Sequence, residues 1–305
     1  MASGALFLIL LCLMLAAPLW AKHIAGTGFA DTNLSDSVTI DGQQTDVVSL
    51  GGVPIGPTWQ GEFFLGADEL GRDLMVRLLY GARTSLVIAF GALALTLTLA
   101  LPLSLAAGYF RGRVDAVVSR LLDLIWSFPA LLLGVLLGTA LTIRGATIGP
   151  ITIDAGSKLI PIVVIGVVYV PYMARPLRGQ VLALRERQFV EAARAAGAPP
   201  LRVMRRELLP HLWSSILVLS TVLVANGVVL ESALSFLGAG VAPPEPSLGT
   251  LIAAGVDTIY LSPHLLVVPS VALVLIVLSL SGLAEGLRRT LDPRRSLAVD
   301  LTRGQ

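Results

Sequence analysis

The sequence is short of charged residues and nearly free of cysteine. Only 14% of its 305 residues are Asp, Glu, Lys or Arg, whereas a soluble domain carries about 25%. The single cysteine, Cys12, has no second cysteine to pair with, and it excludes a metal site built on cysteines. A net charge of +2 gives no electrostatic footprint for nucleic acid. With 55% hydrophobic residues, the composition favours a membrane protein in contact with the lipid bilayer.

Lysine is also scarce, which bears on how the protein is powered. Only Lys22 and Lys158 are present, and neither follows glycines at the spacing of a nucleotide-binding loop. We therefore expect no ATP site, no metal and no catalytic residue on this chain, and we do not expect it to be an enzyme.

Six apolar runs approach the length of a membrane-spanning helix, which needs about 20 residues. They are residues 5–21, 85–110, 124–143 (with a more polar lead-in from 114), 159–174, 212–230 and 265–284. The fourth run is short and contains Pro161 and Pro171. The first run could instead be a signal peptide, but its start lacks Lys and Arg and its apolar part is long, which favours an uncleaved helix.

Lysine and arginine predict the orientation, because cytoplasmic loops carry an excess of both. Fifteen arginines fall at 111–113, 175–206 and 288–303, whereas six basic residues fall in the alternate loops. Arg120 lies at a membrane edge and is assigned to neither side. Both termini are therefore predicted to be cytoplasmic, and residues 22–84 are predicted to form an outer loop.

The outer loop holds two local signals. Asp41 and Gly42 stand between short apolar stretches, which weakly indicates a hairpin turn. Leu70, Leu74 and Leu78 recur at helical spacing, which predicts an amphipathic helix over residues 68–80 on the outer membrane surface. The alternative is an ordinary exposed helix that packs on its own domain.

The polar segment between the fourth and fifth runs reads as helix, sharp turn, helix. Alanine and arginine favour helix over residues 188–196. Gly197 can adopt the left-handed conformation that ends a helix, and a proline at 199 or 200 can start the next. Small alanine faces allow a partner backbone to approach closely, and charged neighbours offer anchors. The residues of this predicted docking surface are Glu191, Ala192, Ala193, Arg194, Gly197, Arg202, Leu209 and Pro210. From composition alone, a basic helix lying on anionic lipid is an equal alternative.

The order of these residues favours the docking surface over the lipid-bound helix. The pattern EAA at 191–193, then Gly197 and Leu209-Pro210, resembles the EAA loop of ABC-importer permeases. Two further blocks narrow the resemblance. One is LGADELGRD at 65–73, followed by RLLYGARTSL at 77–86; the other begins ESALSFLG at 231–238. The blocks together are similar to the second, C-type permease of the dipeptide/oligopeptide/nickel importer family, over about residues 65–292.

This resemblance implies an all-α membrane protein, a six-helix transmembrane bundle of the type I ABC importer permease kind, in a bacterial or archaeal cytoplasmic (inner) membrane. The apolar runs and loop charges, together with the three blocks, divide the chain into three expected parts. These are an N-terminal transmembrane helix and extracytoplasmic loop with an amphipathic helix over 1–84, a permease core over 85–286 that contains the cytoplasmic EAA loop at 188–210, and a cytoplasmic tail over 287–305. The resemblance also implies partners: a homologous second permease, two cytoplasmic ATPases that bind ATP and Mg, and an extracytoplasmic substrate-binding protein. The expected function is half of a pathway for peptides or a similar small solute.

Polar residues in the fifth run are candidates for the translocation path or gate. Ser220, Thr221 and Asn226 each more often form a helix–helix hydrogen bond than a substrate contact. Glu231, an acidic residue near the outer end of this run, is a functional candidate. The alternative is that Glu231 simply emerges at the membrane interface.

Two further pairs have structural interpretations. Arg120 and Asp123 have the spacing of an intrahelical ion pair. In the outer block formed by Asp68, Gly71, Arg72 and Asp73, we expect Arg72 and Asp73 to fix the outer helix against the bundle.

Three rival functions are weaker. A secondary transporter driven by an ion gradient usually has ionisable residues near mid-membrane or paired broken helices, and here only the prolines of the fourth run hint at a break. A membrane scaffold would not explain the three blocks. A channel would need a filter-like loop or a ring of acidic residues, and neither is apparent.

Overall fold

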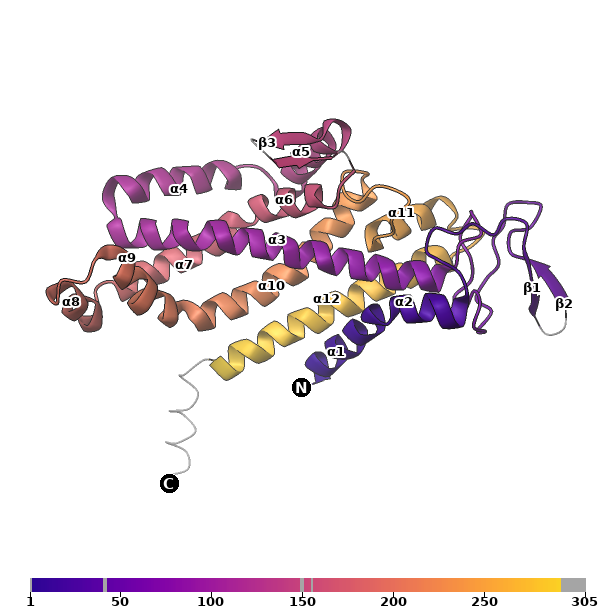
Figure 1. The fold of residues 1–305 in the computed structure, drawn as a ribbon, viewed down its shortest axis with the longest axis horizontal. Helices are drawn as coiled ribbons and strands as arrows, with labels where there is room; N and C mark the ends of the chain where they lie inside the picture. Colours follow the sequence, from indigo (N-terminus) through magenta and orange to yellow (C-terminus); the bar gives the residue numbers. More distant parts are fainter. Residues whose placement is uncertain (1, 41–42, 149–150, 155, 292–305) are drawn as a thin grey trace, which may run out of the picture.

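A computed structural model describes residues 2–40, 43–148, 151–154 and 156–291 of the chain. Helices dominate it, and two short hairpins complete it (Figure 1). The first half contains α1 (Ala2–Leu15), α2 (Ala17–Trp20), η1 (Ala21–Ala25), β1 (Ser37–Ile40), β2 (Gln43–Asp46), α3 (Leu74–Phe110), α4 (Gly112–Trp126) and α5 (Ala130–Arg144). The second half contains β3 (Ala146–Ile148), β4 (Ile151–Ile153), α6 (Leu159–Val168), α7 (Val170–Leu184), α8 (Gln188–Ala195), α9 (Pro200–Arg202), η2 (Val203–Leu208), α10 (Leu209–Phe236), α11 (Leu248–Asp257) and α12 (His264–Leu291).

The long helices form one elongated bundle. Within the described residues, four continuous helical stretches are long and apolar enough to cross a membrane, and two bent helix pairs bring the number to six if each pair is one span. This agrees with the six predicted spans. The helix α8 lies at one end of the bundle and the β1–β2 hairpin lies at the other (Figure 1). With the predicted orientation, the α8 end is cytoplasmic and the hairpin end is extracytoplasmic.

The prediction of a separate surface helix over residues 68–80 is wrong. Residues 68–72 form a tight turn, because the Asp68 carboxylate accepts hydrogen bonds from the backbone N–H groups of Leu70 and Arg72, both at 3.0 Å. Asp73 then caps the next helix by accepting from Val76 N at 2.9 Å. The helix that starts there, α3, continues through the whole second span to Phe110.

The third span is broken rather than straight. Its two parts, α4 and α5, meet at an angle of 83°. Pro129 cannot continue the preceding helix and disfavours helical geometry in the residue before it. Ser127 caps the end of α4 by donating its hydroxyl to the carbonyl of Leu124 at 2.7 Å. The proline that separates the two helices therefore lies inside the run that we predicted as one span.

The fourth span is longer than predicted. It runs as α6 and α7 from Leu159 to Leu184, well beyond the predicted end at Ala174. Tyr169 separates the two helices, and Pro171 stands in the first turn of α7, where its missing N–H is tolerated. Within α7, Arg175 and Arg178 pair with Asp123 and Asp115 of α4.

The N-terminal helices pack on the last span. Ser3 lies beside Gly282, and Gly4 lies beside Leu283, so the start of α1 packs near the end of α12. The two helices run in opposite directions (Figure 1). The pair α1 and α2–η1 bends by 48°. The start of α1 and the end of α12 both point toward the α8 end of the bundle (Figure 1), as predicted for two cytoplasmic termini.

The predicted hairpin in the outer loop forms. Strands β1 and β2 pair antiparallel, with Ile40 opposite Gln43. Its turn residues, Asp41 and Gly42, lie outside the described part of the chain, as do residues 292–305 of the predicted tail.

Close backbone contacts hold the outer end of the bundle together. A side chain on Gly249 at the start of α11 would place its Cβ 2.1 Å from the carbonyl oxygen of Ser232 in α10. Such a contact requires the two helices to separate, because densely packed interiors resist insertion of even one methyl group.

We therefore expect Gly249→Ala to destabilise the protein by about 1–3 kcal/mol. Thermal unfolding of the purified membrane protein in mild detergent would report the change. Gly179→Ala on α7 is the matched control, since no heavy atom lies within 4 Å of its added Cβ, and alanine favours a helix more than glycine does. Equal melting temperatures for the two variants would contradict the close approach of α10 and α11.

Candidate functional site

The predicted helix–turn–helix forms at the tip of the bundle. Helix α8 is followed by Ala196 and by Gly197, which has φ +78°. The amide of Gly197 donates to the Arg194 carbonyl at 2.9 Å, and the amide of Ala198 donates to the Ala193 carbonyl at 3.0 Å. These bonds satisfy carbonyls at the helix end, as in a glycine C-cap. The next helix begins at Pro200, as one of the two predicted alternatives required.

Apolar and aromatic contacts hold α8 against the membrane bundle. Val190 is fully buried and belongs to the main core cluster together with Val203 and Leu208 of the π-helical segment η2. Phe189 stacks on His211 with ring centroids 4.6 Å apart. One side of α8 is therefore packed on the start of the fifth span.

A second set of contacts joins this region to the inner end of α3. The guanidinium of Arg194 lies over the Tyr109 ring, 4.7 Å from its centroid, and Arg185 donates a hydrogen bond to the Tyr109 carbonyl. Arg111 also pairs with Glu186 at 2.8 Å. Arg194 thus contacts its own chain, whereas we predicted it as an anchor for a partner. These contacts attach α8 and its flanking residues to two different spans of the bundle.

The opposite side of α8 is free. Glu191, Ala192 and Gly197 are exposed, Ala193 is half-buried, and Arg202 on the next helix is exposed. This surface combines small side chains with one anion and one cation, so a partner could approach the backbone closely and still find charged anchors.

Leu209 and Pro210 lie inside a helix rather than at a break. The stretch from Pro200 to Phe236 is one helical rod, and its segment η2 is π-helical just before Pro210. A proline cannot donate to the carbonyl four residues earlier, and its ring clashes with that carbonyl. A π-helical turn relieves this conflict, so the rod passes from cytoplasm to membrane without interruption.

Glu231 is enclosed at the outer end of the fifth span. Its exposed fraction is 0%, so its side chain is enclosed by protein. Ser235 donates to its Oε1 at 2.6 Å, Ser232 lies 3.5 Å from its Oε2, and the hydroxyls of Ser85 and Ser247 also face the carboxyl group. Ser85 in addition accepts the N–H of Leu248 at 3.2 Å. This cluster joins α10 to α3 and to the start of α11.

The other three candidates of the fifth span differ in their surroundings. Thr221 donates to the Leu217 carbonyl of its own helix at 3.0 Å. Ser220 is half-buried, whereas Asn226 is exposed on the bundle surface. The backbone carbonyl of Asn226 accepts a hydrogen bond from the Tyr169 hydroxyl at 3.1 Å, which ties the fourth span to the fifth. Of the three, Asn226 is the most exposed, and Ser220 and Thr221 are half-buried.

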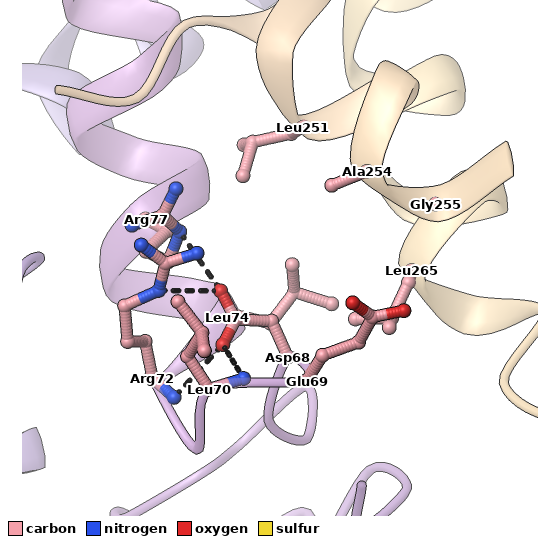
Figure 2. Close-up of a pocket in the computed structure, with 10 residues that line it drawn as sticks. All are labelled: Asp68, Glu69, Leu70, Arg72, Leu74, Arg77, Leu251, Ala254, Gly255 and Leu265. Carbon is pink, nitrogen blue, oxygen red and sulfur yellow. Dashed lines mark hydrogen bonds and ion pairs between the residues drawn. The ribbon is translucent and has the colours of Figure 1, made fainter. Parts of the chain in front are cut away.

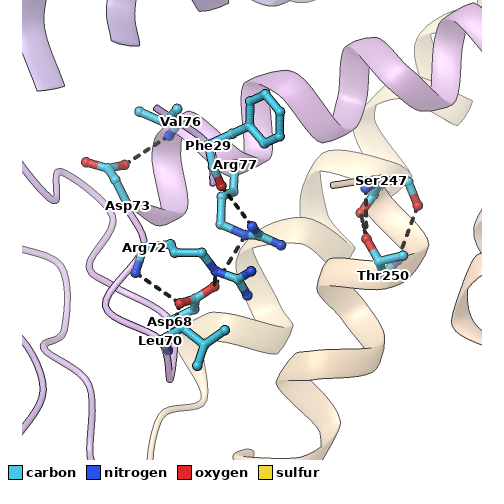
Figure 3. Close-up of polar contacts among 9 residues, drawn as sticks. All are labelled: Phe29, Asp68, Leu70, Arg72, Asp73, Val76, Arg77, Ser247 and Thr250. Atoms are coloured by element: carbon cyan, nitrogen blue, oxygen red, sulfur yellow. Dashed lines mark hydrogen bonds and ion pairs between the residues drawn. The ribbon is translucent and has the colours of Figure 1, made fainter. Parts of the chain in front are cut away.

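The outer block is a polar cluster at the start of α3 (Figure 3). Asp73 is 1% exposed, and its two oxygens accept from Val76 N at 2.9 Å and Phe63 N at 2.8 Å. Burial raises the pKa of the Asp73 carboxyl above its ordinary value, and these hydrogen bonds oppose that shift. Asp68 pairs with Arg72 at 2.7 Å, and Gly71 donates its N–H to the Asp68 carbonyl at 2.9 Å. The block fixes the entry to α3, in place of the predicted surface helix.

The predicted pair between Arg120 and Asp123 does not form. Asp123 instead pairs with Arg175 of α7 at 2.6 Å, and that guanidinium lies over the Trp126 ring at 4.5 Å. Asp115 accepts from Arg178 at 2.5 and 2.7 Å. These pairs hold α4 along α7, and sequence spacing alone could not reveal them because the partners are more than fifty residues apart.

Sequence reasoning also missed Tyr109, Tyr169, Ser85 and Arg77. Of these, Ser85 and Arg77 lie inside the family block at 77–86, which was a usable signal. The two tyrosines stand in apolar runs with nothing to mark them. In the described residues, no group of three or more His, Cys, Asp or Glu side chains is placed to hold a metal ion.

Comparisons with known proteins place the chain in a family context. A family model described as "Binding-protein-dependent transport system inner membrane component" matches residues 100–297. The chain is 35% identical to the di/tripeptide transport system permease protein DppC of Pseudomonas aeruginosa over 242 residues, 78% of this chain and 76% of the relative. It is 32% identical to the glutathione transport system permease protein GsiD of Pectobacterium atrosepticum, over 76% of this chain and 72% of the relative.

A solved structure supports the fold. A chain of the MetNI methionine ABC transporter, in an inward-facing conformation, superposes with a TM-score of 0.57. The sequence identity is 21%, and the match covers 72% of this chain and 98% of that one. The bundle therefore has the type I ABC importer permease fold.

The geometry around Glu231 makes a specific prediction. Glu231→Ala removes the acceptor of the surrounding serine hydroxyls and leaves a cavity, which costs about 1–3 kcal/mol for the unmade hydrogen bonds alone. We expect a lower melting temperature and faster hydrogen–deuterium exchange of α11 amides. Glu231→Gln, which keeps the volume and one acceptor, is the control and should exchange nearly as slowly as wild type. If α11 exchanges equally in all three proteins, the cluster does not hold this helix.

Proposed function

Because this chain belongs to the family of binding-protein-dependent transport system inner membrane components, we propose that it moves short peptides into the cell as one half of an ATP-driven importer. It is a multi-pass permease subunit of the inner membrane. The cargo proposal is supported by the relatives, one of which is a di/tripeptide permease and another a glutathione permease; glutathione is itself a short peptide.

The observation that carries the ATP-driven mechanism is the attachment of α8. Its inner side is packed on the fifth span through Val190 and on α3, the second span, through Arg194 and Tyr109. Its outer side leaves Glu191 and Ala192 exposed. A partner ATPase that grips this exposed side would therefore displace two spans together.

The partners follow from what the chain supplies. Two cytoplasmic ATPases would bind ATP and Mg²⁺, and one of them would dock on α8. A homologous second permease would complete the pathway, and a substrate-binding protein would deliver cargo from outside. No covalent chemistry is assigned to this chain.

The energetics require a difference in affinity between two states. ATP can drive the bundle from one conformation to the other only if the nucleotide-bound ATPases hold the permease in one of them more tightly. A rigid α8 transmits such a preference, whereas a loosely attached helix would move without shifting the spans.

The alternative is a transporter driven by an ion gradient, which would need an acidic group available to bind the coupling ion. Glu231, Asp115 and Asp123 are each engaged in contacts within the protein. The buried acid Glu231 is enclosed by serines and joins three helices, which suits a structural role. The pairs of Asp115 and Asp123 with arginines lie between α4 and α7.

Reconstitution in proteoliposomes tests the proposal. The chain, its second permease and both ATPases are combined with the binding protein and a labelled dipeptide. We expect uptake only when ATP is present on the side of the membrane that carries the ATPases. The rate of ATP hydrolysis should rise when loaded binding protein is added. Uptake that follows a proton or sodium gradient without ATP would refute it.

The turn at Gly197 gives a mutational test of coupling. A β-branched residue at φ +78° costs about 1–2 kcal/mol in backbone strain, and no neighbouring atom lies within 4 Å to add a clash. We expect Gly197→Val to lower uptake about tenfold while basal ATP hydrolysis persists, because a tilted α8 no longer transmits the ATPase movement. Gly197→Asn is the control, since asparagine tolerates this conformation. Normal uptake by Gly197→Val would remove the turn from the coupling mechanism.

A further inference from the structure

A small pocket opens at the end of the bundle opposite α8. Its volume is about 180 Å³, and it lies between the entry to α3 and the corner where α11 meets α12 (Figure 2). One wall is apolar and is made by Leu251, Ala254, Gly255 and Leu265. The facing wall carries Asp68, Arg72 and Arg77 together with Leu70 and Leu74, and Glu69 also lines the pocket.

Arg77 is an unusual residue in this wall, because it is buried while one of its N–H donors lacks a hydrogen-bond acceptor among the described residues. Its exposed fraction is 6%. Its Nη1 donates to the Phe29 carbonyl at 2.9 Å. Its Nε lies 3.3 Å from Asp68 Oδ2, an ion-pair distance, but within the described chain this N–H has no aligned hydrogen-bond acceptor. A buried guanidinium donor without an acceptor costs free energy unless a ligand supplies one.

The contacting cluster of Asp68, Arg72 and Arg77 has two guanidiniums and one carboxylate. Asp68 uses Oδ1 to accept the amides of Leu70 and Arg72, and its Oδ2 accepts Arg72 Nε at 2.7 Å. One carboxylate therefore serves two guanidiniums, and both of its oxygens are occupied. The Arg72 side chain is 16% exposed, and it lines the pocket.

The arrangement selects the chemistry of the ligand. Arginine binds carboxylates and phosphates through parallel N–H donors. Glu69 extends toward Leu265, away from the guanidiniums (Figure 2), and its negative charge disfavours a dianion more than a monoanion. The apolar wall accommodates a short hydrocarbon group beside the charge.

We propose that this pocket is a binding site for a carboxylate group that carries a small apolar substituent, on the extracytoplasmic face of the permease. The carboxylate chemistry stands on the pocket itself. Its source rests on the proposed peptide import: either the C-terminal carboxylate of the cargo or an acidic side chain of the binding protein.

Direct binding tests the site. The assembled transporter in nanodiscs, without binding protein, is titrated with N-acetyl-alanine in saturation-transfer NMR, and with N-acetyl-alanine amide as the uncharged match. We expect binding of the acid and not of the amide. Arg72→Gln should weaken binding of the acid at least about tenfold, the size of effect expected when a charge-assisted hydrogen bond is lost.

A second variant of the same pocket should raise the affinity for the acid instead of lowering it. Glu69→Gln removes a negative charge from the pocket lining and leaves the Asp68 turn untouched, so the acid should bind more tightly than to wild type. Thermal melting confirms that both variants are folded, and the Glu69→Gln result decides the question if Arg72→Gln does not fold. Equal binding of acid and amide, or affinities that neither variant changes, would overturn the proposal.

A second measurement separates the two sources. The affinity of peptide-loaded binding protein for the assembled transporter is compared between wild type and Arg72→Gln. A weaker complex identifies an acidic side chain of the binding protein as the ligand. An unchanged complex, with uptake still reduced, identifies the cargo. ATP-dependent uptake by the wild-type transporter is scored separately, so failure of the importer proposal is distinguishable from failure of the carboxylate site.

Discussion

The packing of α3 against the fourth and fifth spans is the contact on which the rest of the structure depends. Small residues allow this close approach: Gly108 lies against Val181, Gly166 against Leu95, and Gly227 against Ala89. Thr96 adds a hydrogen bond to the Gly166 carbonyl at 2.8 Å. Small residues and interhelical hydrogen bonds are what hold helices together where water cannot drive association. A larger residue along this line would separate helices that carry both ends of the molecule.

Because α3 has 37 residues, it spans about 55 Å and connects the two polar regions of the protein. Its outer end is capped by Asp73 and carries Arg77, and its inner end carries Tyr109, on which Arg194 rests. The charged pocket and the docking helix are therefore built on the same rod. Movement of α8 by a partner would act on a helix whose far end forms one wall of the outer pocket.

Breaks in the helices occur where a neighbouring group satisfies the freed backbone or relieves the strain. Ser127 caps the break before Pro129, and the π-helical turn η2 makes room for Pro210. Within a membrane each unsatisfied peptide group is costly, so irregular backbone survives only where it is repaired locally or buried in protein. The 83° bend in the third span follows this rule, and it places α4 beside α7, where the Asp115 and Asp123 carboxylates meet arginines.

The sequence by itself determined the class of protein, the six spans, their orientation and the helix–turn–helix of the EAA loop. These features depend on local properties: the length of apolar runs, the sign of loop charges, and the conformations open to Gly197 and the prolines after it. Only the tertiary structure decided which polar groups meet. Arg194 lies on Tyr109, Asp123 pairs with Arg175 and not with Arg120, and Glu231 is enclosed by serines from three elements. Likewise residues 68–72 form a turn instead of a helix, because the Asp68 carboxylate accepts hydrogen bonds from the backbone of Leu70 and Arg72. The spacing of the leucines could not indicate these bonds. Each outcome depends on a partner or a side-chain geometry that spacing along the chain does not encode.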